Sequence, residues 1–171
     1  MVASAVYILD LKGKVLISRN YRGDISAAAV DKFLPLVLDA ENEEQQTPVV
    51  VGDGVSYVYV KHNNLYILAV TRKNSNVGTI VVYLHKMIQV FEGYFKDLQE
   101  ESIRDNFVII YELLDEMMDF GYPQITESKI LQEFYFLLFL FLFLFFIDLF
   151  IYFDLILHSY SHFHYFIYPN F

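Results

Sequence analysis

Short apolar runs and longer stretches of helical periodicity alternate along the first 133 residues. Runs of β-branched and aromatic residues bounded by Gly, Asn or Asp predict strands at 3–11, 15–19, 49–51, 55–61 and 65–71. Apolar residues that recur every three or four positions predict helices at 27–38, 77–98 and 103–120. This order predicts an α+β protein, in which an antiparallel sheet carries helices on its faces.

Local signals refine the ends of these helices. Pro35 lies inside the first helix and predicts a kink there. Ser102 to Asp105 resembles a capping box and predicts the start of the third helix, which Gly121-Tyr122-Pro123 should end. A short amphipathic segment that contains Ile130 and Leu131 is expected to follow.

The composition changes abruptly after Glu133. Seventeen of the last 38 residues are aromatic, their only charges are Asp148 and Asp154, and they contain no Gly, Lys or Glu. Residues 1–133 hold all 12 basic and 19 acidic residues, for a net charge of −7. The sequence therefore predicts a soluble-type domain at 1–133 and a hydrophobic low-complexity tail at 134–171.

Three interpretations of the tail stay open. Its residue types are those of pyrimidine-rich codons, which favours translated intron or a misplaced exon boundary. It could instead be a membrane anchor, but the uncharged run 134–147 is shorter than the roughly 20 residues of a spanning helix, and no Lys or Arg follows it. It could also pack on the domain.

Charge and missing motifs exclude several functions. A net charge of −9 disfavours nucleic-acid binding, and the absence of cysteine excludes disulfides and thiolate zinc sites and favours the cytosol. No phosphate-binding glycine loop or nucleophile elbow is present, so we predict no enzyme and no cofactor. His62 is interpreted as an exposed turn residue, and the biased composition around His158, His162 and His164 disfavours a metal site.

Four basic residues surround the first predicted hairpin: Lys12, Lys14, Arg19 and Arg22. They could form a patch for a membrane surface or an acidic partner. The favoured alternative is a solvated strand edge that its charges protect against unwanted pairing.

Three long strings carry a family resemblance. They are SAVYILDLKGKVLISRNYRGD at 4–24, KHNNLY at 61–66, and ESIRDNFVIIYELLDE at 101–116 with DFGYP at 119–123. They resemble the medium (mu) chains of heterotetrameric clathrin adaptor complexes, and LDLKG at 9–13 and SKILQE at 128–133 resemble the type-one, trans-Golgi and endosomal, complex. The resemblance covers residues 1–133.

The resemblance implies a longin-like domain with one helix on one side of the sheet and a helix pair on the other. It implies a non-catalytic assembly module that binds a large β-type adaptin, beside a second large chain and a small sigma chain. The complex links clathrin to cargo on trans-Golgi and endosomal membranes, so a cytoplasmic, peripheral location is implied. Family chains continue into a domain that reads sorting signals, and recognition of those signals is therefore not expected of this sequence.

A packing argument selects the residues that would contact a partner. The apolar stripes of 77–98 and 103–120 exceed what so small a domain can bury, which predicts an interface. The candidates are the exposed sides of Phe91, Phe95, Ile103 and Phe107. The alternative function is a membrane-anchored longin-type trafficking regulator that uses the tail as its anchor.

Overall fold

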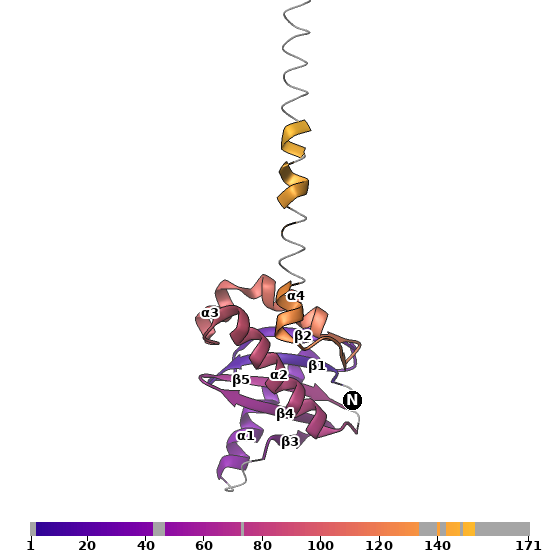
Figure 1. The fold of residues 1–171 in the computed structure, drawn as a ribbon. Coiled ribbons are helices and arrows are strands. Elements are labelled where there is room, and N and C mark those ends of the chain that lie inside the picture. Colours follow the sequence, from indigo (N-terminus) through magenta and orange to yellow (C-terminus); the bar gives the residue numbers. More distant parts are fainter. Residues whose placement is uncertain are drawn as a thin grey trace, which may run out of the picture. The chain divides into compact units, whose positions relative to one another are not determined.

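The computed structural model describes residues 3–42, 47–72, 74–133, 140, 143–147 and 149–152. It divides into two compact units, Met1–Leu131 and Gln132–Phe171. Helices and strands of the first unit form an α+β domain (Figure 1).

Five strands of the first unit form one antiparallel sheet. They are β1 (Ala5–Asp10), β2 (Val15–Asn20), β3 (Val49–Gly52), β4 (Val55–His62) and β5 (Leu65–Thr71). Their spatial order is β2-β1-β5-β4-β3, so β2 and β3 are the edges. The central strands β1 and β5 are almost wholly buried and are correspondingly apolar. Asp53 and Asn63 take positive φ in the predicted tight turns, which these residue types tolerate.

Helices cover both faces of this sheet. A 3-10 helix, η1 (Ala27–Lys32), leads into α1 (Phe33–Asn42), and α2 (Val77–Phe95), α3 (Glu100–Asp105) and α4 (Phe107–Met117) follow the last strand. Figure 1 shows α2 lying across the sheet. The side chain of Asn76 accepts a hydrogen bond from the Thr79 N–H at 3.2 Å and caps the start of α2. The predicted fold class is confirmed.

Phe33 anchors α1 on its face of the sheet. Its side chain is fully buried, and its ring lies 5.1 Å from Tyr59, 5.6 Å from Tyr66 and 6.1 Å from Tyr57 between centroids. Two of these contacts are edge-to-face, the arrangement that the ring quadrupoles favour. The aromatic cluster therefore fixes α1 against β4 and β5.

Phe33→Ala is expected to lower the free energy of unfolding by about 3 to 5 kcal/mol, because it removes a buried ring and leaves a cavity. Urea unfolding of the full chain measures the loss. Leu38→Ala on the exposed side of the same helix is the control and should change stability by less than about 0.5 kcal/mol. Equal losses for the two variants would contradict this account of the core.

The first predicted helix is not one kinked helix. Residues 27–32 form the 3-10 segment η1, and Pro35 is the third residue of α1. The N–H groups of the first helical turn have no partner within the helix, so a proline there costs no hydrogen bond. The predicted helix is therefore divided two residues before Pro35, and the assignment of residues 33–42 to one α-helix shows no break at Pro35 itself.

The third predicted helix is also divided. It begins at Glu100 rather than at Ser102 and is interrupted at Asn106, whose φ of −120° and ψ of 24° are not helical. The hydroxyl of Ser102 donates to the carbonyl of Asp97 at 2.7 Å instead of capping a helix. The second predicted helix ends at Phe95 because Lys96 takes a φ of 65°.

A two-residue hairpin follows α4. Its strands β6 (Met118–Asp119) and β7 (Tyr122–Pro123) flank Phe120 and Gly121, which both have positive φ. The Ala3 N–H donates to the Gly121 carbonyl at 3.1 Å, which joins this turn to the start of the chain. The predicted helix end at 121–123 is wrong, because α4 ends at Met117, where Met118 takes an extended conformation and begins β6. The helical residues 128–133 include the buried Leu131 and the exposed Ile130.

The described part of the second unit is helical at 140, 143–147 and 149–152. Its apolar side chains are between 40% and 70% exposed. Within these described ranges we find no helix with the length and apolar character that crossing a membrane requires. His158, His162 and His164 lie outside the described residues, and the three interpretations of 134–171 stay predictions.

Candidate protein-interaction surface

The four candidate contact residues do not share one exposed face. Phe91 is fully buried and Ile103 is only 1% exposed, so the expectation that they present exposed sides is wrong. Phe95 is half-buried and packs on Tyr94 and Phe91, at 6.1 and 6.4 Å between ring centroids. Phe107 is 53% exposed and is the candidate that the structure leaves accessible.

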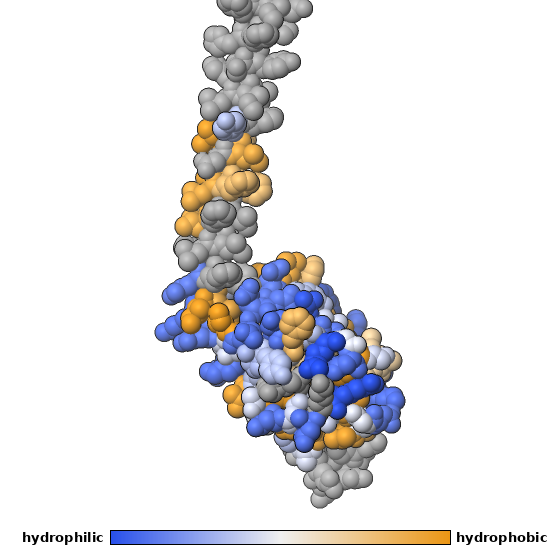
Figure 2. Space-filling model, turned by 90° about the vertical axis from the view of Figure 1, so that its right-hand side faces the viewer, coloured by the Kyte–Doolittle hydropathy of each residue, from blue (hydrophilic) through white to orange (hydrophobic). Residues whose placement is uncertain are grey.

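Phe107 belongs to an apolar surface at the start of α4. Phe107, Val108 and Ile109, which we call the α4 first-turn surface, are 53%, 57% and 39% exposed. Successive helical residues project about 100° apart, so these three cover more than half of the helix circumference. The opposite side of α4 carries its buried residues, Ile110, Leu113, Leu114 and Met117. Figure 2 shows separate hydrophobic areas on the otherwise hydrophilic side of the domain that it presents.

Val108 and Ile109 were missed by the sequence argument, which considered only the stripe of one helix face. The exposure of Val108 and Ile109 could have been predicted from the run of four apolar residues at 107–110. One helix face cannot bury four consecutive residues, so part of such a run must be exposed or covered by another chain.

Polar contacts with β2 and the residue after it hold α4 in place. The Nε of Arg19 lies 2.6 Å from Oδ1 of Asp115, and its Nη2 donates to Oδ2 at 2.8 Å. Both side chains are more than 40% exposed, so this ion pair orients the helix more than it stabilises the fold. The Tyr21 hydroxyl donates to the Leu114 carbonyl at 2.8 Å.

Tyr21 also makes the free energy of unfolding of the domain depend on pH in the alkaline range. Burial raises the pKa of Tyr21 and of Tyr83 above the ordinary value of 10.0. Above pH 10 the unfolded chain releases these protons while the folded chain retains them, so stability falls as pH rises. The stability present below pH 10 is thus lost progressively above it.

Tyr21→Phe is expected to cost about 1 kcal/mol at pH 7, because it removes one hydrogen bond to the Leu114 carbonyl. The decline in stability above pH 10 should become shallower in the variant, because one of the tyrosines with a raised pKa is gone. Urea unfolding at pH 7 and above pH 10 measures these two effects. Tyr122→Phe, at an exposed tyrosine, is the control. An unchanged alkaline decline in Tyr21→Phe would contradict the assignment.

The basic hairpin is partly neutralised. Arg19 pairs with Asp115, and Arg22 pairs with Asp24 at 3.4 Å. Lys12 and Lys14 are exposed and make no ion pair among the described residues. Because β2 is an edge strand, the two lysines place positive charge along this edge, which favours the interpretation of a solvated edge protected against pairing with another basic strand.

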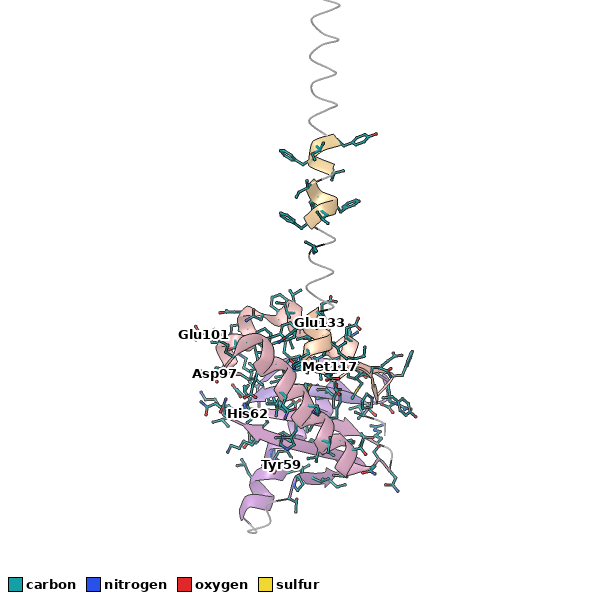
Figure 3. The ribbon with its side chains drawn as sticks, in the orientation of Figure 1. Tyr59, His62, Asp97, Glu101, Met117 and Glu133 are labelled. Carbon is teal, nitrogen blue, oxygen red and sulfur yellow. The ribbon has the colours of Figure 1, made fainter. Side chains whose placement is uncertain are left out.

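His62 lies at the end of β4 rather than in a turn. It is half-buried, and its Nε2 lies 3.1 Å from Oε1 of Glu92 on α2, so the predicted exposed turn position is wrong. Figure 3 shows His62 on the same side of the domain as Asp97 and Glu101. In the described part of the chain, no group of three or more His, Asp or Glu side chains could hold a metal ion.

The five-stranded antiparallel sheet and its helices define an α+β domain in which the start of α4 is apolar and exposed. Residues 2–136 match the family model described as the clathrin adaptor complex small chain, and the chain belongs to this family.

Curated relatives are more specific. The chain is 60% identical over 134 residues to the AP-1 complex subunit mu of Dictyostelium discoideum, which covers 78% of this chain and 31% of the relative. It is 56% identical over 134 residues to AP-1 complex subunit mu-1-I of Caenorhabditis elegans, which covers 78% of this chain and 32% of that relative. The chain therefore spans about a third of the length of these relatives.

A structural comparison supports the fold. A homology model of the full-length AP-3 complex in a stretched open conformation contains a chain that matches with a TM-score of 0.58 at 13% identity. The match covers 75% of this chain and 88% of that chain. The predicted relation to clathrin adaptors is confirmed at the level of the family and the fold.

Proposed function

We propose that this chain is a mu-type subunit of an AP-1-type clathrin adaptor complex in vesicle-mediated intracellular protein transport. The observation that carries the proposal is the 60% identity to an AP-1 mu subunit over 134 residues. In this proposal residues 1–133 are a non-catalytic assembly module without cofactors, and residues 134–171 are a separate hydrophobic tail.

The proposed partner of the α4 first-turn surface is the large β-type adaptin. Three apolar side chains on one helical turn provide the kind of apolar centre that protein interfaces bury. Exposed carboxylates follow on the same helix at Glu112 and Glu116, so the partner surface is expected to be apolar with a basic rim. The ion pair of Arg19 with Asp115 and the hydrogen bond from Tyr21 to the Leu114 carbonyl hold α4, and with it this surface, in a fixed orientation.

The remaining partners follow from the same assignment. A second large subunit and a small sigma subunit would share the complex, and clathrin would be reached indirectly. Membrane contact would come through the complex, on the cytoplasmic side of trans-Golgi and endosomal membranes and on coated vesicles. The relatives do not favour the alternative of a membrane-anchored longin-type regulator, because those compared are adaptor subunits.

Site-specific photocross-linking tests the proposed contact. The full chain with a benzophenone amino acid at Phe107 should cross-link to the β-type large subunit in cells. The same amino acid at Val82, an apolar position on α2 that is 60% exposed, should give no such product. A cross-link from Val82 but not from Phe107 would contradict the surface assignment.

A further inference from the structure

A groove of about 350 Å³ lies between β2 and the α3–α4 pair. One side comes from the consecutive residues 14–17, and the other comes from Ile103, Arg104, Phe107 and Tyr111. Alternate side chains of a strand point to opposite faces of a sheet. The pairing of β2 with β1 shifts register between Val15 and Ile17, so this alternation is interrupted there, and the hollow follows the edge of the sheet from Lys14 to Ile17.

The backbone of this edge can accept another strand. β2 is outermost in the sheet and pairs with β1 alone. The Tyr21 N–H donates to the Ser4 carbonyl at 2.9 Å, and the antiparallel alternation then turns the N–H and C=O of Ser18 away from β1. No hydrogen bond among the described residues uses these two groups of Ser18.

The opposite wall is apolar along a line. Phe107 and Tyr111 are four residues apart on α4 and form a row on one side of that helix. Ile103 of α3, which precedes the interruption at Asn106, also lines the groove. Ile103 is buried, and Phe107 is half exposed. Apolar side chains of an extended segment could pack against this row.

Charge selects the partner. Lys14 borders the groove and has no ion pair among the described residues, and Lys12 is exposed beside it. Two copies of the chain that paired antiparallel through Ser18 would set Lys14 of each copy opposite Arg22 of the other, and like charges that face one another across strands are unfavourable. An acidic segment would instead be attracted.

We propose that the groove binds an extended, acidic and apolar peptide segment of another protein as an additional strand beside β2. Backbone hydrogen bonds to Ser18, the residue that directly follows the groove-lining residues 14–17, provide the pairing. The apolar side chains of α3 and α4 receive alternate apolar side chains of the peptide, and Lys14 pairs with a carboxylate. This inference rests on the groove alone and not on the proposed function. Phe107 borders both surfaces, so the test leaves it unchanged.

Binding of a fluorescein-labelled peptide of alternating isoleucine and glutamate, about ten residues long, to the full chain tests the proposal by fluorescence anisotropy. Ser18→Pro removes an outward N–H and blocks strand addition, and it should weaken binding at least about tenfold. Val51→Pro, the same exchange at an outward position on the other edge strand β3, is the matched control and should leave binding unchanged. Lys14→Glu should weaken binding about fivefold.

A second measurement does not depend on the folding of the proline variant. The same peptide with alternate backbone nitrogens methylated cannot pair with a strand and should bind the unaltered chain at least about tenfold more weakly. Equal binding of the methylated and unmethylated peptides would overturn the proposal. So would the absence of saturable binding, or a dimer in sedimentation equilibrium that Lys14→Glu strengthens.

Discussion

Replacing Phe107 by aspartate is expected to reduce recovery of the β-type large subunit with this chain by at least about 30-fold. The variant would place a carboxylate in the α4 first-turn surface, at the apolar centre of the proposed interface. Disrupting a residue at the centre of an interface costs about 2 kcal/mol or more of binding free energy. Co-purification of the tagged full chain from cells measures the loss.

Val82→Asp is the matched control for this variant. Val82 is also an exposed apolar residue on a helix, at 60% exposure, but it lies on α2 outside the proposed surface. It should leave recovery unchanged. If folded Phe107→Asp still co-purifies with the β-type subunit at normal yield, the interface assignment is wrong.

Gly121→Ala is expected to lower the free energy of unfolding by about 3 kcal/mol or more. Gly121 has a φ of +85°, and an added Cβ would lie 2.1 Å from the carbonyl oxygen of Ala3. The alanine would therefore add backbone strain and force apart the contact through which the turn binds residue 3. Thermal and urea unfolding of the full chain measure the effect.

Gly54→Ala is the control that separates the steric clash with Ala3 from the backbone strain of an alanine at positive φ. Gly54 has a similar φ of +72°, but an added Cβ there would have no neighbour within 4 Å. This variant should lose only the cost of positive φ, about 1 kcal/mol. Equal losses at the two glycines would show that contact with Ala3 does not contribute.

The sheet could be predicted from local signals. Each strand is bounded by residues with a defined turn preference, and Asp53 and Asn63 take the positive φ that these residue types tolerate. The apolar content of β1 and β5 also agrees with their central places. The pattern of apolar residues in a strand and the residue preferences of a turn both depend on only a few neighbouring residues. They can therefore be recognised in a single sequence.

The candidate surface could be predicted less well, because exposure depends on tertiary packing. Phe91, Ile103 and Phe107 all fit a helical stripe, but only the arrangement of α2, α3 and α4 decides which of them is buried. The division at Asn106 changes the direction of that stripe, and its side chain donates to the Ser102 carbonyl at 2.8 Å. The interruption at Asn106 could not be predicted from the spacing of the apolar residues alone.

Recovery of adaptor subunits with the tagged full chain tests the central claim most directly. The chain would be expressed in cells and probed for the β-type large subunit and the small sigma subunit. Tagged residues 1–133 and the matching 134-residue segment of the Dictyostelium discoideum AP-1 mu relative would be tested beside it. The account predicts that the full chain and residues 1–133 both recover the two subunits. If the relative recovers them and neither form of this chain does, the chain is not an adaptor subunit.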